Sequence, residues 1–355
     1  MEDIKKILSE KKIIIDKVIE KYIPRRFDNK TIEFICGKPR YKYNIEAPQQ
    51  ALSKPLWEFL DRGGKRWRPA LFLLLIEALG DDPKKYMDFV IIPEVVHNGS
   101  LIVDDIEDNS DIRRDKPCCH KIFGVDVAIN CGNAMYFLPL LSLIKSREIS
   151  AETKNKIYGV YAQEMISLSF GQAMDIAWHK GIANADKITE GEYLQMCAYK
   201  TGTLARMSAK IAAILVGVSD RVLEKIGYFA ESIGVAFQIQ DDILNLIGEV
   251  DEYGKEIGGD ISEGKRTLMV IHTLQNADER DKKRLVEILC MHTKDQKLIG
   301  EAVEIIKKYD SINYAKNFAR KMINDTWCEI DKLLKKSEAK NKLKAFVDFL
   351  VEREF

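Results

Sequence analysis

The sequence lacks an excess of charge of either sign, since its 55 basic residues are matched by 55 acidic ones. A general nucleic-acid binder normally carries a basic surplus, so we expect no nucleic-acid partner. Seven cysteines in 355 residues are too few for a disulfide framework, and no Cys-x-x-Cys spacing supports zinc. Free thiols are typical of a reducing compartment, so we expect a cytoplasmic protein.

Long apolar runs are also missing. The best of them, ALFLLLIEAL and FLPLLSLI, are shorter than the roughly 20 residues that cross a bilayer. The N-terminus, MEDIKKILSEKK, is charged throughout and is unlike a signal peptide. We therefore expect no transmembrane segment.

Strand patterns are scarce, and helical periodicity recurs almost everywhere. The first 22 residues form an amphipathic pattern, followed by an expected irregular connection at 24–47. Further helices are expected near 48–61, 66–80, 83–108, 126–147, 150–180, 187–216 and 219–248, and again after a glycine-rich polar stretch at 249–265. A loop with the arginines is expected at 109–125. Several of these helices are apolar on most faces, which favours an all-α fold. We expect a single large bundle of long antiparallel helices around a central apolar cavity.

Acidic side chains crowd the end of the helix expected at 83–108, in the stretch SLIVDDIEDNSDIRRDKP. Asp104 and Asp108 lie four residues apart and share a helical face, while Asp105 lies one step round. The helix dipole disfavours anions at this end, so something must compensate. For this cluster alone, a solvated helix end remains an alternative.

A second oxygen-rich patch weakens that alternative. The stretch FQIQDDILN repeats the spacing with Asp241, Asp242 and Asn245. Two such patches on two long helices suggest a shared hard cation. Carboxylates spaced in this way suit Mg²⁺, which keeps waters and binds substrate phosphates.

Basic side chains lie beside glycines or acids at several points. The stretches DRGGKRWRP, DIRRD, YKTG and YGKEIGGDISEGKRT supply them. Each alone is more typical of a solvated face. Together with the acids they predict a diphosphate held by metals on one side and by arginines and lysines on the other.

In their order and spacing, these motifs resemble the trans-isoprenyl diphosphate synthases, which are the polyprenyl synthetase family, of the farnesyl and geranylgeranyl type. The matching motifs run from Gly63 to Thr267: GGKRWRP, EVVHNGSLIVDDIEDNSDIRRDKP, GQAMD, KTG, FQIQDD and YGKEIGGDISEGKRT. The resemblance implies the isoprenoid synthase type I fold, a homodimer, and Mg²⁺-dependent head-to-tail (1′-4, trans) condensation of an allylic diphosphate with isopentenyl diphosphate. We expect one polyprenyl synthetase domain over 1–355, with 1–47 preceding a catalytic bundle at 48–355.

The resemblance also implies roles for individual residues. Isopentenyl diphosphate would be bound by Lys65, Arg68, His97 and Arg114. The allylic diphosphate would be surrounded by Arg113, Lys200, Thr201, Gln238, Lys255 and Lys265. Three Mg²⁺ ions would be held by Asp104, Asp108 and Asp241, with Asp105, Asp242 and Asn245 as further candidates. The catalytic set would be Asp104, Asp105, Asp108, Lys200, Asp241 and Lys255, with Gln172, Asp175 and Asp260 beside or just behind it.

Two positions need separate comment. Asn245 stands where the family often has aspartate; it keeps an oxygen acceptor but loses the charge, so its role as a metal ligand is open. His97 alone would be interpreted as a core histidine, but it lies seven residues before Asp104, two turns along the same face. We interpret His179, His272 and His292 as ordinary histidines.

Small residues precede the first acidic patch. Val96, Gly99 and Ser100 lie eight, five and four residues before Asp104, where bulky side chains limit some family members to fifteen carbons. We therefore predict a product of C20 or longer, with geranylgeranyl diphosphate first and farnesyl or C25-and-longer diphosphates as alternatives. On this argument Gly99→Phe should shorten the product.

Two rival functions remain. A terpene cyclase shares the all-α fold and a DDxxD motif but has no use for GGKRWRP and His97, and it would act without isopentenyl diphosphate. A non-catalytic subunit of a heteromeric synthase usually loses its acidic motifs, whereas both are present here. Turnover by the protein alone, with and without Mg²⁺, separates these alternatives.

Overall fold

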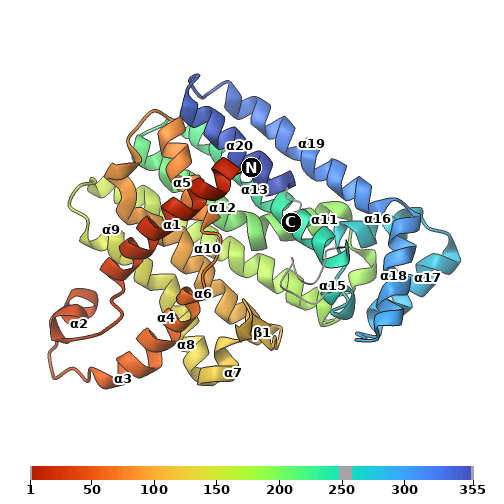
Figure 1. The fold of residues 1–355 in the computed structure, drawn as a ribbon, viewed down its shortest axis with the longest axis horizontal. Coiled ribbons are helices and arrows are strands. Elements are labelled where there is room, and N and C mark those ends of the chain that lie inside the picture. The colour runs from red at the N-terminus through yellow and green to blue at the C-terminus, as the bar shows by residue number, and fades with distance from the viewer. Residues whose placement is uncertain (1, 248–257, 353–355) are drawn as a thin grey trace. The chain divides into compact units, whose positions relative to one another are not determined.

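The computed structural model describes residues 2–247 and 258–352 (Figure 1). Within these residues the strands are two residues long, β1 (Ile112–Arg113) and β2 (Lys116–Pro117), and every other regular element is a helix. The predicted all-α class is therefore confirmed. The chain packs into two compact units, one of residues 1–158, 211–217 and 337–343, and one of residues 159–210, 218–336 and 344–355. The single domain over 1–355 stays a prediction.

The first unit, which contains the GGKRWRP and first acidic motifs, is built mainly from the N-terminal half of the chain. Its elements are α1 (Glu2–Tyr22), α2 (Asn29–Cys36), α3 (Glu46–Pro48), η1 (Gln49–Ser53), α4 (Lys54–Asp61), α5 (Trp67–Ala78), η2 (Pro83–Val90), α6 (Ile91–Glu107), the two strands, α7 (Cys119–Phe123), α8 (Val125–Phe137), η3 (Leu138–Leu140), α9 (Leu141–Lys145) and the start of α10 (Ala151–His179). Helix α5 is buried at all but one of its positions, which explains why its sequence is apolar on every face.

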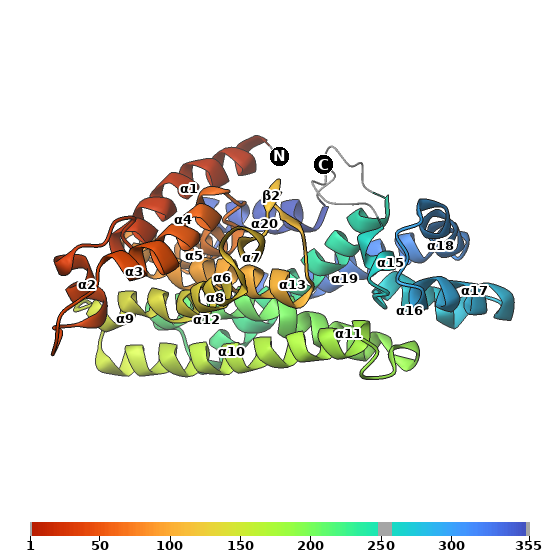
Figure 2. The ribbon, with the colours of Figure 1, turned by 90° about the horizontal axis from the view of Figure 1, so that it is seen from below.

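Helices α6 and α8 pack closely side by side (Figures 1 and 2). A pair of glycines permits the contact, because a Cβ on Gly99 would lie 2.7 Å from the Met135 Cβ and 2.9 Å from the Gly132 carbonyl oxygen. A Cβ on Gly132 would in turn lie 2.7 Å from Val103 Cγ2. Neither helix can move closer or accept a larger residue at these points.

The second unit contains the second acidic motif. Its elements are the rest of α10, η4 (Ala185–Lys187), α11 (Glu190–Cys197), η5 (Ala198–Gly202), most of α12 (Thr203–Val216), α13 (Asp220–Ile247), α15 (Gly259–Ser262), α16 (Leu268–Asn276), α17 (Glu279–Cys290), α18 (Gln296–Lys308), α19 (Ser311–Asp331) and part of α20 (Glu338–Glu352). Helix α13 packs along α19 and against η5, and α17 pairs with α18.

Three expectations about local structure were wrong. The connection at 24–47 contains a further helix, α2, which begins with a capping box between Asp28 and Thr31. The loop expected at 109–125 contains the β1–β2 hairpin and α7. The single helix expected at 187–216 is interrupted by a π-helical turn, η5, over 198–202.

One described stretch, Val125–Lys145, is long and apolar enough to cross a membrane by length and composition, with 44% of its window buried. This is weak evidence for a span, because the core helices of globular proteins pass the same test. Part of the stretch is α8, which packs against α6.

Candidate active site

In the first unit, the basic loop before α5 brings together residues of the predicted isopentenyl diphosphate site. Gly63 and Gly64 have φ values of 88° and 138°, which suit glycine. A Cβ on Gly64 would lie 3.1 Å from Arg114 Nη2, so the arginine approaches the bare backbone. Arg68 is buried at the start of α5, whereas Lys65 is exposed on the loop.

His97 lies among these arginines on α6. Burial first, and then the charges of Arg68 and Arg114, hold the pKa of His97 well below 6.5. The imidazole is therefore neutral at pH 7, and the cluster of Arg68, His97 and Arg114 is a positive group suited to an anion.

The acidic end of α6 presents its aspartates in different directions. Asp105 is fully buried, and Arg113 Nε donates to its Oδ1 over 2.7 Å. Burial raises the pKa of Asp105, although Arg113 opposes the shift. The Asp104 side chain is 20% exposed and lies 3.5 Å from Arg113 Nη2, and Asp108 is half-buried at the end of the helix. Asp104 and Asp108 are thus the more accessible carboxylates, and Asp105 is an internal partner of Arg113.

A two-residue turn directs the arginines that follow. In the β1–β2 hairpin Arg113 pairs with Lys116, and the intervening Arg114 and Asp115 have φ values of 54° and 60°. Two successive positive φ values are typical of a type I′ turn. The turn sends Arg113 to the acidic patch and Arg114 to the basic loop.

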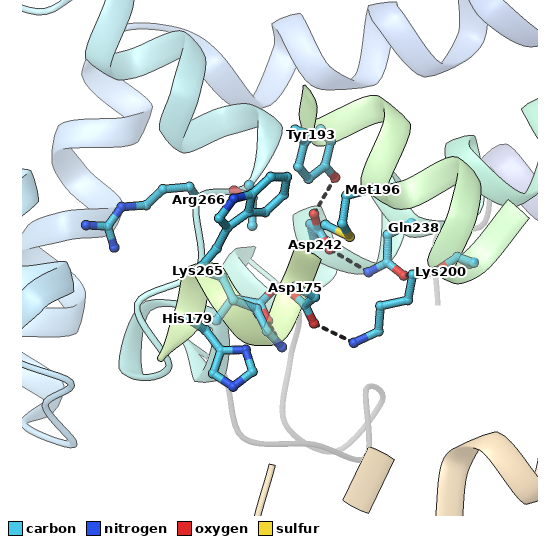
Figure 3. Close-up of a pocket in the computed structure, with 13 residues that line it drawn as sticks. Asp175, His179, Tyr193, Met196, Lys200, Gln238, Asp242, Lys265 and Arg266 are labelled. Carbon is cyan, nitrogen blue, oxygen red and sulfur yellow. Dashed lines mark hydrogen bonds and ion pairs between the residues drawn. The ribbon is translucent and has the colours of Figure 1, made fainter. Parts of the chain in front are cut away.

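In the second unit, a small pocket gathers most of the residues predicted around the allylic diphosphate (Figure 3). Four of them line it, namely Lys200, Thr201, Gln238 and Lys265, together with the candidate metal ligand Asp242. Asp175 and Asp260 also line it, as expected for residues beside the main set. The pocket therefore combines ammonium groups, carboxylates and neutral polar groups.

The π-helical turn η5 carries Lys200 and Thr201 into this pocket. Glycines on both neighbouring helices make room for its backbone: a Cβ on Gly171 of α10 would lie 2.3 Å from Lys200 N, and a Cβ on Gly234 of α13 would lie 2.5 Å from Gly202 Cα. The turn is therefore fixed by backbone contacts on two sides, which limits how far Lys200 can move.

Hydrogen bonds orient the polar groups behind the pocket. The Tyr193 hydroxyl donates to Asp242 Oδ2 over 2.6 Å, and Gln238 Nε2 donates to Asp242 Oδ1 over 2.8 Å. Thr201 Oγ1 donates to Gln238 Oε1 over 2.8 Å. Burial, with a smaller contribution from Asp260, raises the pKa of Asp242 to about 8.

The two pocket lysines are each paired with an acid. Lys200 Nζ bonds to Asp175, as the dashed line in Figure 3 marks. Lys265 Nζ lies 3.5 Å from Asp260 and closer to Glu263. Burial alone would lower the pKa of Lys265, but these two acids raise it well above its ordinary value. Lys265 is therefore charged at pH 7.

Asn245 has a role that the sequence did not suggest. Its Oδ1 accepts a hydrogen bond from the Asp260 main-chain N–H over 2.9 Å, and its carbonyl accepts one from Gly258 over 2.7 Å. The amide oxygen that made Asn245 a candidate metal ligand thus also holds the backbone at α15.

Some predicted residues lie away from the pocket lining. Asp241 and Gln172 are half-buried and are absent from the lining residues, and Lys255 lies outside the described residues. In residues 2–247 and 258–352, no group of three or more histidine, cysteine, aspartate or glutamate side chains is placed so that it could hold a metal ion.

The sequence interpretation missed several lining residues. Trp178 and His179 lie three and four residues after Asp175 on α10, so helical spacing could have identified them. The interpretation of His179 as an ordinary histidine was thus incomplete. Arg266 and Thr267 also line the pocket; both lie in the motif YGKEIGGDISEGKRT but were assigned no role. Tyr193 and Met196 line it too, and no local motif marked their side chains.

Known proteins share both the sequence and the fold. Residues 49–306 match the Polyprenyl synthetase family. A short chain isoprenyl diphosphate synthase of Methanothermobacter thermautotrophicus is 34% identical over 292 residues, which cover 82% of this chain and 87% of that protein. A geranylgeranyl diphosphate synthase of Sulfolobus acidocaldarius is 33% identical over 88% of this chain and 94% of its own. The crystal structure of a geranylgeranyl pyrophosphate synthetase from Pyrococcus horikoshii superimposes with a TM-score of 0.85 at 33% identity, covering 99% of each chain.

These likenesses, with the helical fold, define an all-α prenyltransferase. The chain belongs to the polyprenyl synthetase family. The predicted family, fold class and enzyme class are confirmed.

Proposed function

We propose that this enzyme condenses an allylic diphosphate with isopentenyl diphosphate, head to tail and in the trans geometry, to make geranylgeranyl diphosphate. The observation that carries the proposal is the presence of two cationic groups in one chain. One is the Arg68–His97–Arg114 cluster, and the other is the pocket with Lys200 and Lys265. A condensation of two diphosphates requires two such sites, and relatives of the same family supply the reaction class.

The charged side chains of the second unit would stabilise the leaving group. Lys200 and Lys265 offer donors to the oxygens of an allylic diphosphate, and Gln238 and Thr201 add neutral polar groups. Because the lysines are already fixed by Asp175 and Asp260, little reorganisation is needed as charge develops. A side-chain nucleophile is not required. The C–O bond to the allylic diphosphate breaks, the isopentenyl double bond attacks the resulting allylic cation, and a proton then leaves to the released diphosphate.

The aspartates of both motifs suit Mg²⁺ in their chemistry. Asp104 and Asp108 are accessible carboxylates one turn apart at the end of α6, and hard oxygen donors of this kind bind Mg²⁺ together with phosphate oxygens. We include Asp241 in the set. When bound, the ions act as Lewis acids that neutralise the diphosphate. The number of ions, three by resemblance, belongs to this proposal.

The product length rests on the small residues of α6. Val96 is fully buried and Ser100 is half-buried, and we propose that they border the growing chain. Gly99 is different, because it forms the close contact with Gly132 and Met135. A phenylalanine at position 99 would push α6 and α8 apart, so Gly99→Phe no longer tests chain length, and Ser100→Phe replaces it.

Product chromatography tests the proposal. The purified protein is supplied with Mg²⁺, labelled isopentenyl diphosphate and dimethylallyl, geranyl or farnesyl diphosphate. We expect C20 product, and Ser100→Phe should shift it toward fifteen carbons. Farnesyl diphosphate alone, or C25 and longer chains, would refute the C20 length. Conversion of an allylic diphosphate without isopentenyl diphosphate would indicate a terpene cyclase, and no turnover would indicate a partner-dependent subunit.

We also propose that the protein is a homodimer that pairs through α8. The side of α8 turned away from its buried positions carries Val125, Ile129 and Phe137, which are 50%, 43% and 68% exposed. They lie four and eight residues apart along the helix, and the exposed Asn133 stands between Ile129 and Phe137. Exposed apolar side chains on a helix already packed on its other side are typical of a surface that a second copy covers.

A further inference from the structure

A buried row of polar side chains in the first unit leads from α1 to Arg114. It begins with Arg66, whose guanidinium is 2% exposed and lies 2.6 Å from Glu94 Oε1 and 3.2 Å from Asp16 Oδ1 of α1. Glu94 is itself 3% exposed. A buried carboxylate of this kind needs a close cation, and Arg66 supplies it.

Asn98 continues the row one turn further along α6. Its side chain is fully buried, and Nδ2 donates to the Glu94 main-chain oxygen over 2.8 Å and to Glu94 Oε1 over 2.6 Å. Because these two Glu94 oxygens can only accept, the amide has one orientation. Its oxygen is thereby directed to Arg114, whose Nη1 donates to it over 3.1 Å.

The hydrogen bonds and the ring contact of Arg114 are with neutral groups, although Glu94 and three arginines lie near enough to affect its pKa. Nη1 also donates to the Gly63 carbonyl oxygen, and the guanidinium lies 5.2 Å from the centre of the Phe59 ring. Burial lowers the pKa of Arg114 to about 10, so it remains charged at pH 7. In contrast to Arg66 and Arg113, it has no carboxylate within ion-pair distance among residues 11–247 and 258–350.

We propose that Asn98 is a positioning residue that presents Arg114 to the diphosphate of isopentenyl diphosphate. The Asn98 amide lies between Glu94 and Arg114. Hydrogen bonds therefore fix the guanidinium, and its positive charge is not paired directly with a carboxylate. An aspartate or glutamate in direct contact would fix Arg114 equally well but would compete with the substrate anion. This inference rests on the proposed function and adds Glu94, Asn98 and Arg66 to the residues that shape the isopentenyl diphosphate site.

The test replaces Asn98 with leucine, which fills similar space but cannot donate or accept. Initial rates are measured against each substrate in turn, and folding is checked by circular dichroism and thermal unfolding. Loss of a hydrogen bond to a charged group predicts a KM for isopentenyl diphosphate raised about tenfold, with the KM for the allylic diphosphate unchanged. The matched control is Ser142→Ala, which removes another fully buried hydrogen bond of the same unit, that to the Pro139 carbonyl, and should leave both KM values unchanged.

A double variant shows whether Asn98 acts through Arg114. In an Arg114→Ala background, Asn98→Leu should add nothing further to the KM for isopentenyl diphosphate. An unchanged KM in the single variant, or an equal additional rise in the double variant, would overturn the inference. A parallel rise in both substrates' KM values would also overturn it, because a general loss of packing gives that pattern.

Calorimetry of isopentenyl diphosphate binding to the wild-type protein distinguishes a failure of the proposed function from a failure of the role given to Asn98. A wild-type protein that neither binds it nor condenses it overturns the proposed function and this inference with it. A wild-type protein that condenses normally, beside an Asn98→Leu variant with normal KM, overturns this inference alone.

Discussion

Neighbouring side chains of one motif have separate tasks in this protein. Asp105 is fully buried against Arg113, while Asp104 next to it is partly exposed. In the second motif Asp242 is bound by Tyr193 and Gln238. The spacing of aspartates in the sequence identifies both motifs, but it cannot separate a ligand from the residue that supports it, because that depends on side chains far away along the chain.

His97 should make the folded state sensitive to acid. Its pKa is below 6.5 in the folded protein, held there by burial and by Arg68, Arg114, Arg113 and Arg66. The unfolded chain therefore binds the proton first, and the free energy of unfolding falls as the pH drops below 6.5. Between pH 7 and pH 5 we expect a loss of up to about 2 kcal/mol from this group.

Urea unfolding at the two pH values measures this loss. His97→Gln should lose less stability than the wild type, by that amount. The exposed His292, replaced in the same way, is the control and should behave as the wild type does. Equal losses in the wild type and in His97→Gln would contradict the assignment.

At the scale of elements, the sequence predicts most of the helices but not the breaks in them. The long helices α10 and α13 match the predicted ranges closely, whereas the helix predicted at 83–108 is divided into the 3-10 helix η2 and α6. The turn η5 was missed, because its residues, AYKTG, contain no proline and a helix could pass through them. What forces the π-helical turn is the approach of Gly171 and Gly234 from two other helices, a tertiary effect invisible to local patterns.

Two glycines of α10 provide a direct test of that explanation. A Cβ on Gly171 would lie 2.3 Å from Lys200 N and 2.6 Å from Tyr199 C, both backbone atoms. Gly171→Ala should therefore lower the free energy of unfolding by about 2 kcal/mol and raise the KM for the allylic diphosphate. Gly159 is exposed and has nothing within 4 Å, so Gly159→Ala should stabilise the helix by up to about 1 kcal/mol.

Urea titrations and initial rates of the two variants check this pair. If Gly171→Ala were as stable and as active as Gly159→Ala, the close backbone contact would not constrain η5, and the explanation of the π-helical turn would fail.

At the scale of the whole molecule, the exposed apolar side chains of α8 bear on how copies of the protein assemble. The stretch Val125–Lys145 is apolar enough to resemble a membrane span, although one side of α8 already packs on α6. We propose that a second copy covers the remaining apolar surface. Composition alone could not separate these alternatives, because both require an apolar helix.

Sedimentation velocity at micromolar concentration tests the pairing. The wild type should be a dimer, and Ile129→Glu combined with Phe137→Glu should be a folded monomer, because charges in an apolar interface lose their solvation. Tyr41→Glu, at a residue that is 81% exposed elsewhere in the same unit, should leave the dimer intact. A monomeric wild type would contradict the proposal.

The hairpin turn at Arg114 has a consequence for directed evolution of this enzyme. Arg114 and Asp115 occupy backbone conformations that glycine or asparagine adopts at lower cost, by about 1 kcal/mol or more per residue. A library screened for heat resistance should therefore favour glycine or asparagine at Asp115, which is exposed. Arg114 should survive such a screen, because its hydrogen bonds to Gly63 and Asn98 offset the cost of its backbone conformation. Within this turn, Asp115 is thus the residue that can be exchanged while the proposed substrate-binding side chain is kept.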